Sequence, residues 1–99
     1  MYKAVLVHEI VPGKLSELKR WFQDEDRERK AKNPDYTPPK RYITVIGNLT
    51  KFYGEFALET VPVHPSVWIE SIEGEGDLKD LIVAGKTELR VLKELEIEG

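Results

Sequence analysis

The chain has 99 residues, which suffices for one domain with a single hydrophobic core. Its 15 basic and 18 acidic residues are mixed along the sequence and give a net charge of −3. The sequence has no basic stripe of the kind that binds nucleic acid, so we expect no nucleic-acid partner. Cysteine is absent, which excludes disulfide scaffolds, thiolate zinc sites and cysteine nucleophiles.

Residues 2–11 alternate as a strand does, and both faces of the strand are apolar. Ala4 and Leu6 lie on one face, Val5 and Val7 on the other. A strand that is apolar on both faces is covered on both faces. No charged leader or long apolar run precedes or follows it, so we expect no signal peptide, no membrane span and a cytoplasmic location.

Pro12-Gly13 ends this strand, and residues 13–32 are expected to form a helix. Leu18 and Phe22 belong to an apolar face in its first half. The second half is almost wholly charged, with acidic residues four positions before basic ones. The three pairs are Glu25 with Arg29, Asp26 with Lys30, and Glu28 with Lys32. Such pairs favour a helix that projects into solvent.

Residues 35–40 contain Pro38-Pro39 and form a connecting loop. Two alternating segments follow, at 41–50 and 52–63, and predict a hairpin with its turn around residues 48–53.

Residues 66–73 fit a short helix and a short strand equally well. Asp77 is predicted to be the N-cap of a second short helix that Gly85 ends. Residues 88–98 alternate as a strand with one polar face. The charged fraction of 33% and the scarcity of asparagine and glutamine resemble the composition of proteins from hot-growing organisms.

The expected order is β-α-β-β-α-β, an α+β split-βαβ or ferredoxin-like subunit with a four-stranded antiparallel sheet. Two helices cover only one face of such a sheet. Because the first strand is apolar on the other face as well, we expect a second copy of the chain to cover it as a homodimer. A monomer with a few exposed valines is the alternative.

Two segments carry a family resemblance. The sequence V-P-G-K-L-S-E-L at residues 11–18 resembles the turn and helix that begin dimeric α+β barrel proteins, which include antibiotic-biosynthesis-monooxygenase-like and NIPSNAP-like domains. The sequence A-G-K-T-E-L-R-V-L at residues 84–92 is similar to the close of small NIPSNAP-like members. The resemblance implies two subunits whose sheets face each other as a barrel, with the helices outside. Residues 66–85 depart from it, being shorter and more glycine-interrupted than the usual helix.

Residues of the types used by oxygenating relatives are candidates for chemistry. His8 interrupts an apolar strand face and titrates near neutral pH, although such a histidine is more often a hydrogen-bonded core residue. We take His8, Asn48 and Tyr42 as catalytic candidates. Aromatic residues form either a small apolar ligand site or part of the core; the ligand-binding candidates are Trp68, Phe56 and Tyr53.

Acidic residues on the expected open or partner-facing sheet surface offer a weaker alternative. Glu9, Glu55 and Glu59 have the chemistry of an acid–base pair or hard-metal ligands, but ion pairing across a dimer explains them more simply. His64, at a strand end, and His8 could supply at most two imidazoles, which is one carboxylate short of a facial iron triad. We therefore expect no metal and no cofactor.

Two functions remain open. One is a dimeric module that binds a small apolar molecule or a protein. The other is a cofactor-free oxygenase or isomerase of an aromatic or polyketide-like substrate, with His8 as general base and Asn48 or Tyr42 orienting the developing oxyanion.

Overall fold

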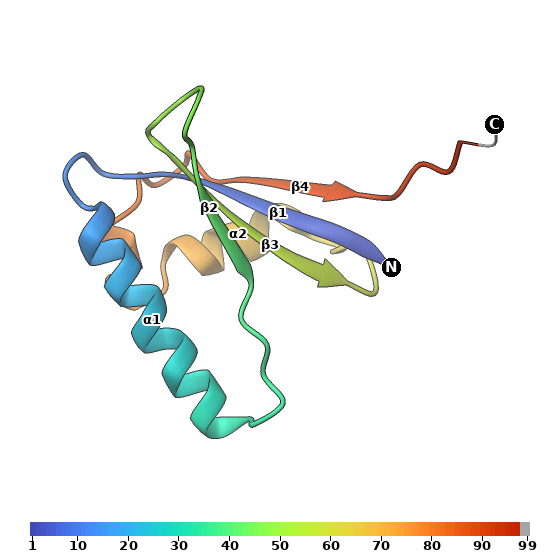
Figure 1. Ribbon diagram of the computed structural model, residues 1–99, viewed down its shortest axis with the longest axis horizontal. Coiled ribbons are helices and arrows are strands. Elements are labelled where there is room, and N and C mark those ends of the chain that lie inside the picture. Colours follow the sequence, from blue (N-terminus) through green and yellow to red (C-terminus); the bar gives the residue numbers. More distant parts are fainter. Residues whose placement is uncertain (98–99) are drawn as a thin grey trace.

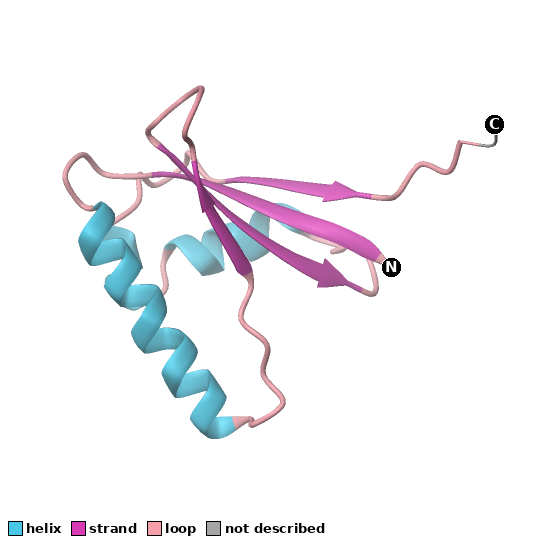
Figure 2. Cartoon of the chain, viewed as in Figure 1, coloured by secondary structure: helices cyan, strands magenta, loops and turns pink. Residues whose placement is uncertain are grey.

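The computed structural model describes residues 1–97 and has the α+β order β-α-β-β-α-β, as expected (Figures 1 and 2). A short 3₁₀ helix, η1, follows the second α-helix. The elements are β1 (Tyr2–Glu9), α1 (Leu15–Lys32), β2 (Lys40–Ile43), β3 (Lys51–Leu58), α2 (Pro65–Glu73), η1 (Gly76–Asp80) and β4 (Glu88–Leu92).

The four strands form one antiparallel sheet in the order β2-β3-β1-β4. This is the strand order of a ferredoxin-like fold, and it confirms the predicted fold class. The turn from β1 into α1 depends on Gly13, whose φ of 80° is costly for any residue with a Cβ atom.

Both α-helices pack on the same face of the sheet. The Phe22 ring of α1 stacks on Phe52 of β3, and Trp68 of α2 contacts Phe56 four residues further along β3. Since residues four apart on a strand share a face, the two helices lie on one side of the sheet. The core on this side also includes Leu18, which is fully buried. Its other buried members are Ile10, Leu78, Leu81 and Ile82.

No helix of the described residues covers the opposite surface, which we call the open face. The strand register places Val5, Val7, Tyr42 and Tyr53 there, among charged side chains. The predicted two-sided apolar character of β1 is thus present, and Val7 is only 2% exposed. Within residues 1–97, no helix is both long and apolar enough to cross a membrane.

Several element boundaries differ from the predictions. β2 ends at Ile43, and residues 44–50 form a connection instead of continuing the strand. Residues 66–73, which the pattern left undecided, are helical because Pro65 begins α2 and fixes its first turn.

The end of the chain also corrects two predictions. Glu75, and not Asp77, precedes η1 as its N-cap residue, and no side chain caps that helix. β4 ends at Leu92, although the sequence pattern predicts a strand up to residue 98. Residue 98 itself lies outside the described residues.

Candidate functional site

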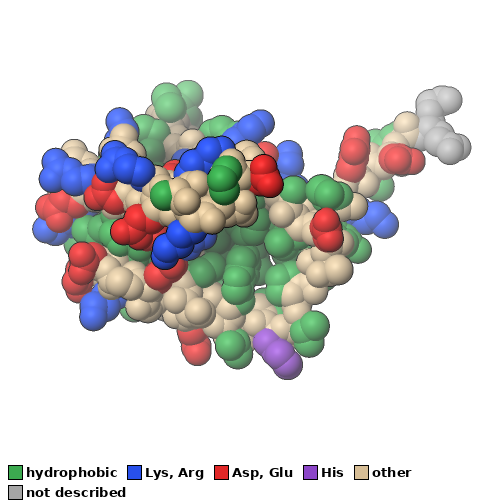
Figure 3. All heavy atoms as spheres, turned by 90° about the horizontal axis from the view of Figure 1, so that it is seen from below, with side chains coloured by type: hydrophobic (Ala, Val, Ile, Leu, Met, Phe, Trp, Pro, Cys, Tyr) green, Lys and Arg blue, Asp and Glu red, His purple; other side chains and the backbone are tan. Residues whose placement is uncertain are grey.

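A broad open cleft lies between the sheet and its two α-helices, with a volume of about 1490 Å³. It is lined by residues of β1, α1, β3 and α2, together with the loop before β2. Figure 3 shows hydrophobic side chains gathered in a hollow of the molecular surface, with charged side chains around it. The cleft is concave and its walls include several aromatic side chains, so it is the candidate ligand site.

Aromatic rings supply much of the cleft wall. On one side Trp21 meets Phe22 edge to face, with 5.1 Å between ring centroids. On the other side Phe56 and Trp68 meet at 5.7 Å, also edge to face. Such walls provide large apolar area together with ring faces on which a planar ligand can stack.

His8 lies at the deep, sheet-side wall of the cleft and is only 3% exposed. Its Nδ1 forms a hydrogen bond of 3.1 Å with Thr87 Oγ1. Burial lowers the pKa of His8 to about 4, and the negative charge of Glu73 offsets only part of this effect. The imidazole is therefore neutral at pH 7. Among the described residues, Nε2 makes no hydrogen bond and is not sealed from solvent, so it is available to a group in the cleft.

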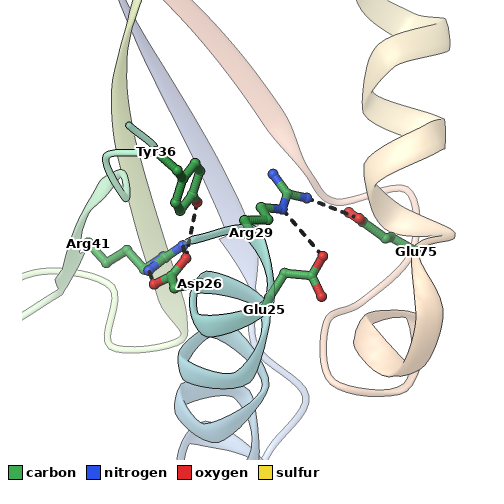
Figure 4. A network of polar contacts seen from close by, with 6 residues as sticks. All are labelled: Glu25, Asp26, Arg29, Tyr36, Arg41 and Glu75. Carbon is green, nitrogen blue, oxygen red and sulfur yellow. Dashed lines mark hydrogen bonds and ion pairs between the residues drawn. The ribbon is translucent and has the colours of Figure 1, made fainter. Parts of the chain in front are cut away.

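A polar network closes one side of the cleft (Figure 4). Asp26 of α1 accepts two hydrogen bonds from the Arg41 guanidinium, one of them at 2.9 Å, and a third from the Tyr36 hydroxyl at 3.1 Å. The Arg41 guanidinium also lies 4.4 Å from the centre of the Phe22 ring. Burial opposes ionisation of Asp26, but the contacts with Arg41 and Tyr36 prevail and lower its pKa.

Arg29, one helical turn further along α1, connects that helix to the segment after α2. Its side chain reaches Glu25 at 3.3 Å and Glu75 at 3.1 Å, and Figure 4 shows it between the two carboxylates. Burial lowers the pKa of Arg29, but the carboxylate of Glu75 and further contacts outweigh it and raise the pKa overall. The charged half of α1 is mostly exposed, as predicted, and within residues 23–32 only Glu25 and Asp26 are partly buried.

The charges around the cleft nearly balance. Five basic and five acidic residues belong to its lining, and His8 is neutral, but the register places the side chains of Lys3, Lys40 and Glu55 on the open face. The ten are Lys3, Arg29, Lys40, Arg41, Lys93, Glu25, Asp26, Glu55, Glu75 and Glu94. A lining of this kind favours neither an anion nor a cation.

The structure brings together some of the residues that the sequence suggested. His8, Trp68 and Phe56 line the cleft. Tyr42 and Tyr53 are register partners on the open face, away from the helices. Their aromatic rings and those of the cleft therefore belong to different surfaces.

Asn48 lies outside the cleft, in the connection between β2 and β3. Its Oδ1 accepts hydrogen bonds from the backbone N–H and the hydroxyl of Thr50, at 3.0 and 2.6 Å. The side chain therefore shapes the turn.

Two of the three acidic candidates, Glu9 and Glu55, are paired within the chain. Glu9 meets Lys51 at 2.6 Å, which lowers the pKa of Glu9, and Glu55 meets Lys3 at 3.4 Å. Residues 1–97 contain no cluster of three or more His, Asp or Glu side chains that suits a metal ion.

Sequence reasoning missed the polar side of the cleft. Helical spacing suggested Lys30 as the partner of Asp26, whereas the partner is Arg41, fifteen residues away. Of the three expected pairs along α1, only Glu25 with Arg29 is present among the described contacts. The position of Arg41 directly after the Pro38-Pro39 loop was the only available signal, and it does not identify a partner.

Comparison with known proteins adds no family to this description. No protein-family model matches the sequence, and no curated protein matches it.

Proposed function

We propose that the protein is a homodimeric binding module that takes a small, mainly apolar ligand without net charge into the cleft between sheet and helices. The observation that carries this proposal is an aromatic-walled cleft whose lining charges nearly balance. Ligand sites are typically concave and apolar, with a few polar groups that fix orientation. His8 Nε2 provides such a group at the deep wall.

The size of the cleft supports a ligand of more than one ring. Its volume of about 1490 Å³ exceeds the roughly 300–1,000 Å³ of many drug-sized sites. Pairs of rings on both walls favour a planar shape, and a neutral imidazole suits a hydroxyl or carbonyl group as its partner.

We further propose that the chain belongs to the dimeric α+β barrel superfamily, as a NIPSNAP-like or antibiotic-biosynthesis-monooxygenase-like protein, and that a second copy covers the open face. The turn and strand motifs at residues 11–18 and 84–92 support the kinship. Tyr42, which is half-exposed, and Val5, which is partly exposed, lie on the face without helices and support the dimer, because burying them against a copy removes apolar surface from water.

A cofactor-free oxygenase or isomerase is the second candidate, and it depends on His8. The side chain reaches the same cleft as Trp68, as a general base for an aromatic substrate must. Its pKa of about 4 makes it a weak proton acceptor at neutral pH, and neither Asn48 nor Tyr42 lines the cleft to orient an oxyanion. Binding therefore has the better support.

The proposal is tested with three ligands that share one ring system. The neutral probe is 2-naphthol, and its charged counterparts are 2-naphthoate and 2-naphthylmethylammonium. Both tryptophans of the chain line the cleft, so their fluorescence reports binding, with calorimetry as the second readout. We expect 2-naphthol to bind at least tenfold more tightly than either ion.

Two substitutions locate the binding. Phe56→Ala removes a ring from the cleft, whereas Tyr53→Ala removes a ring of the open face of the same strand. We expect only Phe56→Ala to weaken 2-naphthol binding. Equal effects of the two variants, or no binding of 2-naphthol, would contradict the proposed site.

A further inference from the structure

The segment of residues 93–97 continues the alternating pattern of β4 but has no strand beside it. Leu95 and Ile97 are 79% and 83% exposed. Figure 1 shows this part of the chain extending away from the rest of the molecule. The reason is the length of β1: its Lys3 lies opposite Leu92, so the neighbouring strand ends where the segment begins.

β4 is also an edge strand. Within the described sheet it pairs with β1 on one side only, and its other edge carries backbone N–H and C=O groups without strand partners. An edge of this kind, followed by an extended segment with apolar side chains, is a template for pairing with another chain.

Residues 88–97 can pair with a second copy of themselves, and in the register below the apolar and oppositely charged pairings outweigh one like-charge pair, Lys93 with Lys93 on the axis. Two copies related by a two-fold axis through the sheet pair antiparallel and keep equivalent faces on the same side. With Lys93 on the axis, Leu95 lies opposite Val91 and Ile97 opposite Leu89.

The charged face of the same segment also matches. In this register Glu96 of one copy lies opposite Arg90 of the other. The Arg90 side chain is 63% exposed, and its ion pair within the chain is with Glu88 at 3.4 Å, so it is available for a second carboxylate. Cross-strand pairs of apolar and of oppositely charged residues both stabilise a sheet.

We propose that residues 88–97 of two copies pair as antiparallel strands and join the two sheets into one of eight strands. We call this pairing the seam. It rests on the proposed function, because it requires the protein to be a homodimer. The seam keeps the open faces of both sheets on the same side, so curling of the joined sheet turns them toward each other. The seam and contact between the open faces are therefore compatible within one dimer.

Lys93→Cys tests the seam directly, because the chain has no other cysteine. Residues opposite each other in antiparallel strands have Cβ atoms about 4.5–5.5 Å apart, close to the separation in a disulfide. We expect mild oxidation to convert the variant to a covalent dimer. Val63→Cys is the control, since Val63 is 84% exposed and lies in the loop before α2. Absence of the Lys93→Cys dimer, or equal crosslinking of both variants, would refute the seam.

Charge reversal gives a second test by sedimentation of the dimer. We expect Arg90→Glu to raise the dimer Kd at least tenfold and Glu96→Arg, added in the same chain, to restore it. If the wild type is a dimer but neither variant changes its Kd, the seam is wrong and the open-face dimer stands. If the wild type is a monomer at every concentration and Lys93→Cys does not crosslink, the proposed dimer fails with it.

Discussion

Asp26→Asn is the most informative single change to the polar side of the cleft. The substitution keeps the shape of the side chain but removes the charge that faces Arg41. Asparagine can accept one hydrogen bond from the guanidinium but not the bidentate pair. The change therefore leaves a half-satisfied, largely buried cation between α1 and β2.

The expected cost follows from burial. The Arg41 and Asp26 side chains are 21% and 20% exposed, between a surface ion pair and a fully buried one. Exposed pairs contribute about 0–1 kcal/mol, and breaking a buried pair costs about 3–5 kcal/mol. We therefore expect Asp26→Asn to lower the free energy of unfolding by about 2 kcal/mol at pH 7 and the Tm by about 10 °C.

Asp24→Asn is the matched control on the same helix. Asp24 and its partner Arg27 are 62% and 79% exposed at 3.4 Å, so we expect a change below about 0.5 kcal/mol. Urea unfolding measures both variants.

The pH dependence provides a second check. The folded-state pKa of Asp26 lies below its ordinary value of 3.8, so the wild type loses this contribution as pH falls through that lowered pKa. The difference between wild type and Asp26→Asn should shrink there. Equal stabilities of the Asp26 and Asp24 variants at pH 7 would refute the reasoning.

Three further predictions concern other parts of the molecule. The pKa of His8 is about 4 in the folded state and 6.5 in the unfolded chain, so the unfolded chain binds a proton at His8 more tightly, and stability falls as pH is lowered through this range. The wild type should lose about 3 kcal/mol between pH 6.5 and 4 in urea titrations, and His8→Gln should lack that component. Val7→Asp should abolish the dimer, as measured by sedimentation. Because Val7 is 2% exposed, circular dichroism must confirm that this variant still folds. Tyr42→Lys repeats the test at a half-exposed position of the open face. Gly13→Ala should cost about 1 kcal/mol, because only backbone strain opposes it, whereas Gly54→Ala should not destabilise; similar melting curves would contradict this.

Residue patterns along the sequence predicted the faces of the sheet well. Alternation assigned Phe52 and Phe56 to one side of β3 and Tyr53 to the other, as the structure has them. Alternation did not reveal where a strand loses its neighbour. β4 ends at Leu92 because β1 is too short to accompany it, although the sequence pattern continues.

The candidate site was less accessible to sequence reasoning. His8, Trp68 and Phe56 were recognised by residue type, and the fold brings all three to the cleft. Asn48 and Tyr42 were equally suitable by type, but the turn and the strand register place them elsewhere. Residue type selects the chemistry that is available, and register decides which side chains share a surface.

The sequence by itself determined the order of the elements, except the state of residues 66–73, and the faces of β1 and β3, because the spacing of apolar residues follows the period of the helix or strand. Only the tertiary structure decided that Asp26 pairs with Arg41 instead of Lys30, and that Arg29 reaches Glu75. An ion pair between distant segments depends on the path of the loops and the packing of the helices. Local spacing carries no information about either, so the polar side of the cleft exists only in the folded chain.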